Sequence, residues 1–263
     1  MKSSDFINIT NRYRLGLDIL SLKKGEAALV QNPALDKPDP EDPLLRTFVS
    51  FALLYDQRLA IAAQPNIYSQ LKAYIPSKDK PEEIYEYLDN IFSKLTLPNA
   101  KKQIVVRRNL LFILAEDDKI KPAGPGVKLT REHRGDIDSL VGGGAFTCAD
   151  ETLDSGLAYG VFKKNNLAAI CYTLPSADPI FSKYADVISV LTHPDYRGQG
   201  LAAGVLSHTA SAILEKGRIA AYGCRDTNTP SAATAKTAGF HLIAKTVRCW
   251  EGPVMNGTPK SFH

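Results

Sequence analysis

One segment in the C-terminal half of the chain combines the residue types that bind a phosphate group, namely Leu191-Thr192-His193-Pro194-Asp195-Tyr196-Arg197-Gly198-Gln199-Gly200-Leu201-Ala202. The apolar residues before it and the helical spacing after it predict a strand, a glycine-rich turn and a helix start. The start of a helix presents unpaired backbone N–H groups and the positive end of the helix dipole. Gly198 and Gly200 allow close approach of an anion because they lack a Cβ, and Arg197 adds a positive charge. The segment therefore predicts a pyrophosphate-binding turn.

Three kinds of phosphate-binding motif compete for this segment. A dinucleotide motif needs a third glycine, and that position after Gly200 is Ala203, which some variants accept. However, no acidic residue ends the next strand, and Asp226 comes only after three further residues. A nucleotide P-loop is excluded because the segment has no G-K-[ST]. The third motif, R-x-x-G-x-A, is matched by Arg197, Gly200 and Ala202, although a structural glycine turn remains the alternative.

The residues around this motif resemble the GNAT superfamily of N-acetyltransferases. In that superfamily a strand ending in an apolar-x-apolar-x-Pro run precedes the motif, and the run 190–194, VLTHP, is similar. A further strand, an N-x-x-[AS] segment, a helix and a Gly-Phe pair then follow; here these positions are Asn228, Ser231, Gly239 and Phe240. The resemblance covers residues 127–248. It looks closest to the branch that includes zwittermicin-resistance-type acetyltransferases.

The resemblance implies a site for acetyl-CoA as cosubstrate. The strand ending at Val190, Leu191 and Thr192 would diverge from the strand over residues 218–222, and its backbone would bond the pantetheine amides. One N–H group, of Val190 or Leu191, would face the thioester oxygen as an oxyanion donor. The pyrophosphate would lie against Arg197, Gly198, Gln199, Gly200, Leu201 and Ala202. Asn228 would reach the pantetheine arm beside Ser231, the alternative being that Asn228 is a turn residue before a helix.

The resemblance also suggests a general base. Some family members carry a carboxylate six residues before the end of that strand, and here the residue is Asp186. A base must take a proton from the acceptor ammonium, directly or through water. The alternative is a solvent-facing aspartate at a strand entry. Asp154 and Glu151, in a segment expected on the acceptor side, are weaker candidates.

The usual general acid of the family is missing. Many members carry a tyrosine seven residues after the asparagine, and Ala235 occupies that position. Tyr222 could substitute from the neighbouring strand; otherwise it lines the core or cleft, and solvent protonates CoA. Cys224 could form an acyl-enzyme, but an unreactive thiol is favoured because no base is evident. We expect positional or surface roles for His193 and His208.

The apolar patterning predicts an α/β protein. The resemblance implies the GNAT fold, a mixed twisted sheet with flanking helices, preceded by a smaller α/β N-terminal domain. A proline- and glycine-rich linker divides the N-terminal domain, residues 1–120, from the acetyltransferase domain, residues 121–263. We expect helices over residues 66–75, 81–95, 131–140, 200–216 and 229–238, with Gly217 ending the fourth and Thr229 capping the fifth. The polar residues 163–166 should form a hairpin turn between the strands on either side of them. We expect strands over residues 104–106, 110–113, 127–129, 159–162, 167–172, 187–191, 218–222 and 242–247.

Composition limits the partners. The formal net charge is +4, and Lys and Arg occur only in short pairs, so no dedicated nucleic-acid surface is predicted. The four cysteines form no C-x-x-C pair, which excludes a familiar zinc motif and predicts free thiols and no metal. The apolar run 47–55 is far shorter than the ~20 residues needed to cross a bilayer, and the first residues lack a signal sequence. We therefore expect a cytoplasmic protein without membrane partners.

These inferences converge on one expected function. The chain is predicted to move an acetyl group from acetyl-CoA to a primary amine of a small molecule, by direct transfer in a ternary complex. A longer acyl-CoA or a protein amine is the alternative within the same fold. A CoA-binding sensor or immunity module without turnover is a different class, which Ala235 favours. We expect the N-terminal domain to form one wall of the acceptor cleft near residues 142–156; otherwise it is a tethered module or a dimerisation domain, and a homodimer stays open.

Overall fold

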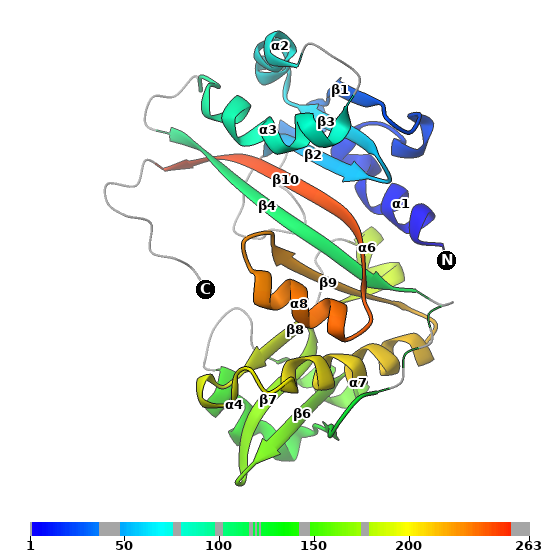
Figure 1. The fold of residues 1–263 in the computed structure, drawn as a ribbon, viewed down its shortest axis with the longest axis vertical. Coiled ribbons are helices and arrows are strands. Elements are labelled where there is room, and N and C mark those ends of the chain that lie inside the picture. Colours follow the sequence, from blue (N-terminus) through cyan, green and yellow to red (C-terminus); the bar gives the residue numbers. More distant parts are fainter. Residues whose placement is uncertain are drawn as a thin grey trace. The chain divides into compact units, whose positions relative to one another are not determined.

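The protein has an α/β fold with mixed strand pairing and flanking helices, as the sequence predicted (Figure 1). The computed structural model describes residues 2–36, 48–75, 80–97, 102–115, 118, 120, 122–141, 148–174 and 179–253. The chain forms two compact units, one of residues 1–7 and 110–243 and the other of residues 8–109 and 244–263. Strands β4 (Lys102–Leu114) and β10 (His241–Pro253) therefore contribute to both units. The assignment of residues 1–120 to an N-terminal domain and of residues 121–263 to an acetyltransferase domain stays a prediction.

The unit of residues 110–243 contains the predicted phosphate-binding segment. Its strands lie in the order β5 (Val127–Lys128), β6 (Ala158–Lys163), β7 (Asn166–Leu174), β8 (Ala185–Thr192) and β9 (Ile219–Arg225), followed by its parts of β4 and β10. Neighbours from β5 to β8 pair antiparallel, whereas β8 and β9 pair parallel. Its helices are η3 (Arg131–His133), α4 (Arg134–Val141), α5 (Asp150–Ser155), α6 (Pro179–Tyr184), η4 (Pro194–Tyr196), α7 (Leu201–Glu215) and α8 (Thr229–Thr237).

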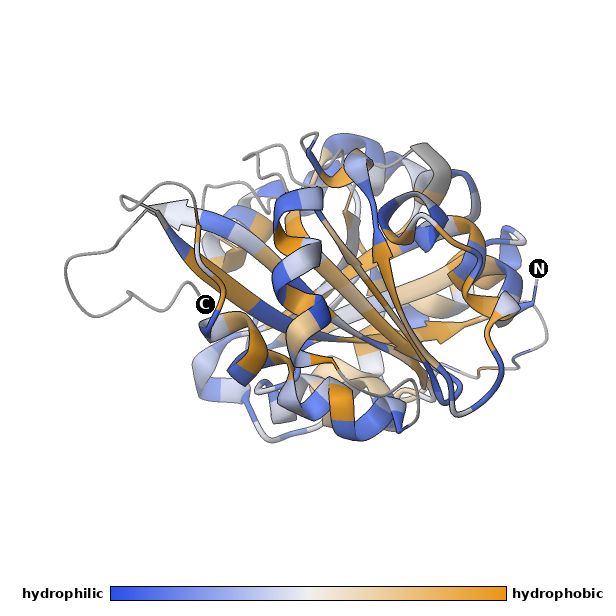
Figure 2. Cartoon of the chain, turned by 90° about the horizontal axis from the view of Figure 1, so that it is seen from above, coloured by the Kyte–Doolittle hydropathy of each residue, from blue (hydrophilic) through white to orange (hydrophobic). Residues whose placement is uncertain are grey.

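Helices cover both faces of this sheet. Cys171 of β7 packs in one apolar cluster with Val205 and Ile213 of α7, and the neighbouring Tyr172 packs in another with Ile137 of α4. Successive side chains of a strand point to opposite faces, so α7 and α8 lie on one face and α4 and α5 on the other. Figure 2 shows the apolar colour concentrated along the strands and the inner sides of the helices.

Several local predictions are confirmed in this unit. β6 and β7 form a hairpin whose turn residues Lys164 and Asn165 have φ of 49° and 65°, the left-handed pair of a tight hairpin turn. α7 ends at Gly217, whose φ of 68° suits the position after a helix. The predicted capping of α8 by Thr229 is wrong. Asn228 caps the helix, because its Oδ1 accepts the backbone N–H of Ser231 at 3.1 Å.

The second unit has its own core. Its strands lie in the order β1 (Ala27–Gln31), β3 (Arg58–Ala63) and β2 (Phe48–Tyr55), followed by its parts of β10 and β4. The remaining helices of the chain are α1 (Ser3–Leu15), which the unit division cuts, η1 (Ile19–Ser21), η2 (Pro33–Asp36), α2 (Pro65–Tyr74) and α3 (Pro81–Ser93). The predicted helix over residues 81–95 is confirmed as α3, which buries Tyr85, Leu88 and Phe92 in this core.

The predicted strands at 104–106 and 110–113 are one continuous strand, β4. The intervening residues 107–109 are polar, which resembles a turn in the sequence, yet Arg108 is held within the strand by ion pairs and main-chain acceptors on α3. No helix in the described ranges is both long and apolar enough to span a bilayer.

Candidate active site

Strands β8 and β9 diverge part of the way along their length. Their parallel pairing runs from Ala185↔Ile219 to Val187↔Ala221. β8 nevertheless continues to Thr192 and β9 to Arg225, and β8 stays paired with β7 as far as Ala169↔Thr192. The predicted separation of these strands is therefore present, and beyond Val187 no described strand pairs with this edge of β8, which is called its open edge below.

The open edge of β8 presents backbone N–H groups. His193 donates its N–H to Ala168 on the β7 side at 2.8 Å. In an antiparallel pair, hydrogen-bonded residues alternate with residues that point the other way, so Leu191 also faces β7. Val190 and Thr192 consequently direct their N–H groups toward the opening. Of the two residues predicted to offer an oxyanion donor, the alternation favours Val190.

The segment predicted to bind phosphate forms the turn that joins β8 to α7. Gly198 and Gly200 both adopt left-handed conformations, with φ of 76° and 73°, which favour glycine. Gly200 is the N-cap of the fifteen-residue α7, and a Cβ at either glycine would meet nothing within 4 Å. This open space lies where the free N–H groups of Leu201 and the following residues point. Arg197 is exposed three residues before Gly200, and its Nε donates to the Thr192 carbonyl at 3.5 Å, so helix N–H groups and a cation belong to the same turn.

The other residues of the segment that were predicted to contact the pyrophosphate lie in different environments. Gln199 is exposed, Leu201 is buried in the core, and Ala202 is half-buried. The hydroxyl oxygen of Thr192 is buried and has no hydrogen-bond partner among the described residues. Thr192 lies two residues beyond Val190 on the face that packs against α7, so its hydroxyl lies on the same side of the sheet as the glycine turn.

The start of α8 brings Asn228, Ser231 and Tyr222 together. Asn228 Oδ1 holds the Ser231 N–H, and within the described part of the chain no acceptor takes the amide N–H groups of Asn228. The Ser231 hydroxyl and the Tyr222 hydroxyl are 2.6 Å apart. Tyr222 is the first β9 residue beyond the last pair with β8, so this hydrogen bond lies where the strands begin to separate.

Burial controls the ionisation of the groups on β9. It raises the pKa of Tyr222, against the opposing effect of the Ser231 hydrogen bond. It also raises the pKa of Cys224, against an opposing effect of Ser231, and the charge of Asp226 adds to the rise. Both groups therefore stay protonated at neutral pH. A neutral tyrosine can donate a proton, whereas a neutral thiol is a poor nucleophile.

Asp186 lies near the start of β8, where β8 and β9 are still paired. Its two carboxylate oxygens accept hydrogen bonds from Arg218, at 2.6 Å from Nε and 3.0 Å from Nη2. Arg218 also donates to the carbonyl oxygens of Ser182 and Ala185. The ion pair gives Asp186 a role in joining α6 and β8 to β9. Its assignment as general base stays a prediction.

His208 has a structural environment. Its ring lies within 3.2 Å of the Gly124 carbonyl oxygen and stacks on Tyr159, with centroids 5.5 Å apart. Gly126 fits there only because it lacks a side chain, since a Cβ would come within 2.3 Å of the His208 ring. The segment 122–126, part of the predicted linker, therefore packs along α7. Together they line a pocket of about 280 Å³ that also includes Gly200 and Thr237.

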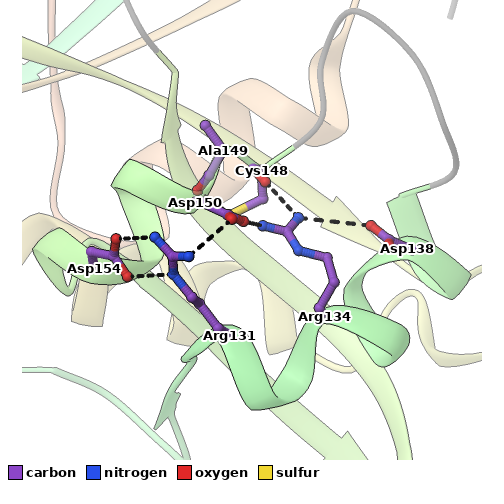
Figure 3. A network of polar contacts seen from close by, with 7 residues as sticks. All are labelled: Arg131, Arg134, Asp138, Cys148, Ala149, Asp150 and Asp154. Atoms are coloured by element: carbon purple, nitrogen blue, oxygen red, sulfur yellow. Dashed lines mark hydrogen bonds and ion pairs between the residues drawn. The ribbon is translucent and has the colours of Figure 1, made fainter.

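An ion-pair network links η3, α4 and α5 on the opposite face of the sheet (Figure 3). Arg131 binds Asp154 through two hydrogen bonds of 2.8 and 2.5 Å, and Arg134 binds Asp150 and the Cys148 carbonyl. Arg131 lowers the pKa of Asp154 through this hydrogen bond. Asp154 is thus held as a charged partner of an arginine. Residues 142–147 of the predicted acceptor-side segment lie outside the described residues.

Among the described residues, no group of three His, Cys, Asp or Glu side chains could hold a metal ion. His193 is half-exposed and accepts the Asp195 N–H through Nδ1 at 3.3 Å, so it shapes the turn. Sequence reasoning missed Arg218 as the partner of Asp186 and missed the contact of residues 122–126 with α7. The proline and glycine content of that segment indicated a loop but carried no signal of what it packs against.

Comparison with known proteins finds a family model that matches part of the chain. The family model described as GNAT acetyltransferase matches residues 139–247, less than half of the 263 residues and inside the range 127–248 expected from the sequence. A search of the curated proteins finds no match.

The comparison with solved structures gives distant similarities. A GNAT-family structure from Novosphingobium aromaticivorans is 22% identical, over 61% of this chain and 71% of that one, with a TM-score of 0.46. A GCN5-related N-acetyltransferase from Sphaerobacter thermophilus is 12% identical, over 80% and 78%, with a TM-score of 0.47. A GNAT-family acetyltransferase from Colwellia psychrerythraea is 14% identical, over 74% and 77%, with a TM-score of 0.43. The segment that the GNAT acetyltransferase model matches, residues 139–247, contains both the diverging strands β8 and β9 and the glycine turn.

Proposed function

We propose that the protein transfers an acetyl group from acetyl-CoA to a primary amine of a small molecule. The observation that carries this proposal is the divergence of β8 and β9 after Val187↔Ala221, beside a helix that begins at a left-handed glycine. The open β8 edge supplies backbone partners for the pantetheine amides, and the start of α7 supplies N–H groups for the pyrophosphate. The finer resemblance to zwittermicin-resistance-type enzymes and a cytoplasmic location stay predictions.

The residues of the opening take distinct roles in this proposal. The Val190 N–H faces the thioester oxygen and stabilises the charge that develops there in the transition state. Arg197 and residues 198–202 bind the pyrophosphate, and the amide of Asn228 donates to the pantetheine arm. Holding amine and thioester together supplies much of the rate acceleration, because the transfer becomes effectively unimolecular.

The proton transfers are assigned to two residues. The acceptor ammonium loses a proton to Asp186, directly or through water, and the neutral amine attacks the thioester carbon. The attacking nitrogen becomes positively charged as the C–N bond forms, and it loses its second proton to solvent. When the C–S bond breaks, its electron pair stays on sulfur, and Tyr222 protonates the leaving thiolate. Tyr222 suits this role because burial keeps its phenol protonated. Solvent then restores the proton of Tyr222, and the base releases its proton to solvent.

Release of free thiol from acetyl-CoA in the presence of a panel of metabolite amines and aminoglycosides tests this proposal. Turnover with at least one amine, with acetylated product found by mass spectrometry, supports it. A CoA-binding sensor is the second candidate, because Ala235 is fully buried where many family members place the acid. A sensor predicts acetyl-CoA binding by calorimetry without thiol release for any amine. Turnover only with longer acyl-CoA or with protein amines would correct the substrate class.

A further inference from the structure

The hydroxyl groups of Ser231 and Tyr222 form a hydrogen-bonded pair where β8 and β9 begin to separate. They lie 2.6 Å apart, and Tyr222 is only 6% exposed, so water does not compete strongly for this hydrogen bond. The Tyr222 ring is held on its other side by Phe240, with centroids 6.2 Å apart. The phenol therefore has one defined hydrogen-bond partner and a restricted ring position.

The position of Ser231 is fixed in turn by the helix it belongs to. Its backbone N–H is held by the side chain of Asn228, the N-cap of α8. Cys224 lies two residues after Tyr222 on the same face of β9 and is half-buried against the same core. A serine hydroxyl has one proton to donate and two lone pairs to accept with. At 2.6 Å, Ser231 can thus donate its proton to the Tyr222 oxygen and still accept a hydrogen bond from another donor.

That arrangement determines the direction of the Tyr222 O–H group. If the Ser231 proton points at the Tyr222 oxygen, the phenolic proton of Tyr222 must point elsewhere. Tyr222 begins the part of β9 that no longer pairs with β8, so the free direction includes the opening. We propose that Ser231 is a positioning residue, which orients the Tyr222 hydroxyl so that its proton is delivered to the departing CoA thiolate. The inference rests on the proposed function, and it gives Ser231 a role beyond contact with pantetheine.

The proton balance is simple. The C–S bond of the tetrahedral intermediate breaks with its electron pair on sulfur, and the Tyr222 O–H proton moves to that sulfur. The resulting phenolate keeps the Ser231 hydrogen bond, which stabilises its charge, and it regains a proton from solvent. Ser231 itself is neither acylated nor deprotonated. In these steps Tyr222 on β9 and Ser231 on α8 together take the role of the tyrosine that many family members carry at the position of Ala235.

The test compares Ser231→Ala with Ser231→Thr, Tyr222→Phe and the double variant Ser231→Ala/Tyr222→Phe. We expect Ser231→Ala to lower kcat nearly as far as Tyr222→Phe, by ~10²-fold, with little change in the KM for acetyl-CoA. The double variant should lose no more than Tyr222→Phe alone, because both changes remove one function. Ser231→Thr should restore most of kcat. Ser211→Ala, at a half-buried serine of α7 whose hydroxyl donates to Glu215, is the matched control and should act like wild type.

Two further readouts separate this role from others. The Ser231 hydrogen bond lowers the pKa of Tyr222, so its loss should move both the alkaline limb of kcat and the titration of the Tyr222 phenol to higher pH. The phenol is followed by NMR of ¹³C-labelled tyrosine, with Tyr222→Phe identifying its signal. Unchanged titration, additive losses, or a raised KM with normal kcat would each overturn the proposal. A wild type without any turnover would defeat the proposed function itself and the delivery role with it, whereas the titration would still judge the hydrogen bond.

Discussion

Gly200 is the residue on which the proposed anion binding should depend most. Its φ of 73° and the empty space around it place backbone N–H groups against the expected pyrophosphate. Gly200→Glu introduces a negative charge and a side chain there, so acetyl-CoA affinity measured by calorimetry should fall by at least ~10²-fold.

Gly217→Glu is the matched control, because Gly217 has a φ of 68° and open space at the other end of α7. The two variants carry similar backbone strain, but only the first alters the glycine turn. Equal acetyl-CoA affinity in both would show that the turn does not bind the pyrophosphate.

Asp186 has two competing roles that its ion-pair partner can separate. As general base, Asp186→Asn should lower turnover by ~10²-fold or more and leave acetyl-CoA affinity nearly unchanged. Arg218→Gln breaks the same ion pair but keeps the carboxylate, so it should retain most of the turnover. If both variants lose turnover equally and unfold at lower temperature, the ion pair is structural and the base lies elsewhere.

The start of α8 shows what residue patterns can and cannot predict. Thr229 and Pro230 are ordinary helix-start residues, which predicted the helix correctly. Two successive residues, Asn228 and Thr229, each offer a plausible cap, and only the hydrogen bond from Ser231 N–H to Asn228 decides between them. The hydrogen bond between Ser231 and Tyr222 could not be predicted from the sequence either, because it depends on how α8 lies over β9.

β4 is the element that most changes the domain division expected from the sequence. Residues 110–114 belong to the same compact unit as the glycine turn, and Phe112 and Leu114 are buried in the core beneath α7 and α8. A chain that begins at residue 121 would lack both side chains. We expect Phe112→Ala to lower the free energy of unfolding by ~3–5 kcal/mol, because it leaves a cavity under two helices.

Urea denaturation followed by circular dichroism measures this loss. Phe112→Leu is the milder comparison and should cost less, because most of the apolar volume is kept. Equal stability of Phe112→Ala and wild type would mean that this part of β4 does not support the unit.

Elements with strong periodicity were predicted well, and uniformly apolar ones were not. α3 and α7 follow helical spacing, and the hairpin of β6 and β7 has a polar turn between apolar runs. β2 and β3 are buried along almost their whole length, so they show no alternation. The order of the strands depends on contacts between residues far apart in the chain, which local patterns do not encode.

The molecule as a whole should be sensitive to alkaline pH. Burial raises the pKa of Cys148 to about 11 and raises the pKa of Cys171 and Cys249 as well. Each folded pKa lies above the unfolded value of roughly 8.5, so this stabilisation is present below that pH and is lost as the pH rises through the folded values. We expect the Tm to fall between about pH 8.5 and pH 11.

Cys148→Ala should make this decline shallower, because one buried thiol no longer titrates. Thermal unfolding of the two proteins at a series of pH values gives the comparison. Parallel curves would contradict the assignment of the alkaline loss to that thiol.

The proposed function depends most directly on acetyl-CoA binding between the diverging parts of β8 and β9. Hydrogen–deuterium exchange of the intact protein, with and without saturating acetyl-CoA, measures this at the backbone itself. Bound CoA should slow exchange in peptides covering residues 190–192 and 198–202, where N–H groups face the open strand edge and the start of α7. α4 and α6 of the same unit should exchange as before. Protection confined to other segments, with residues 190–202 unchanged, would contradict the central claim.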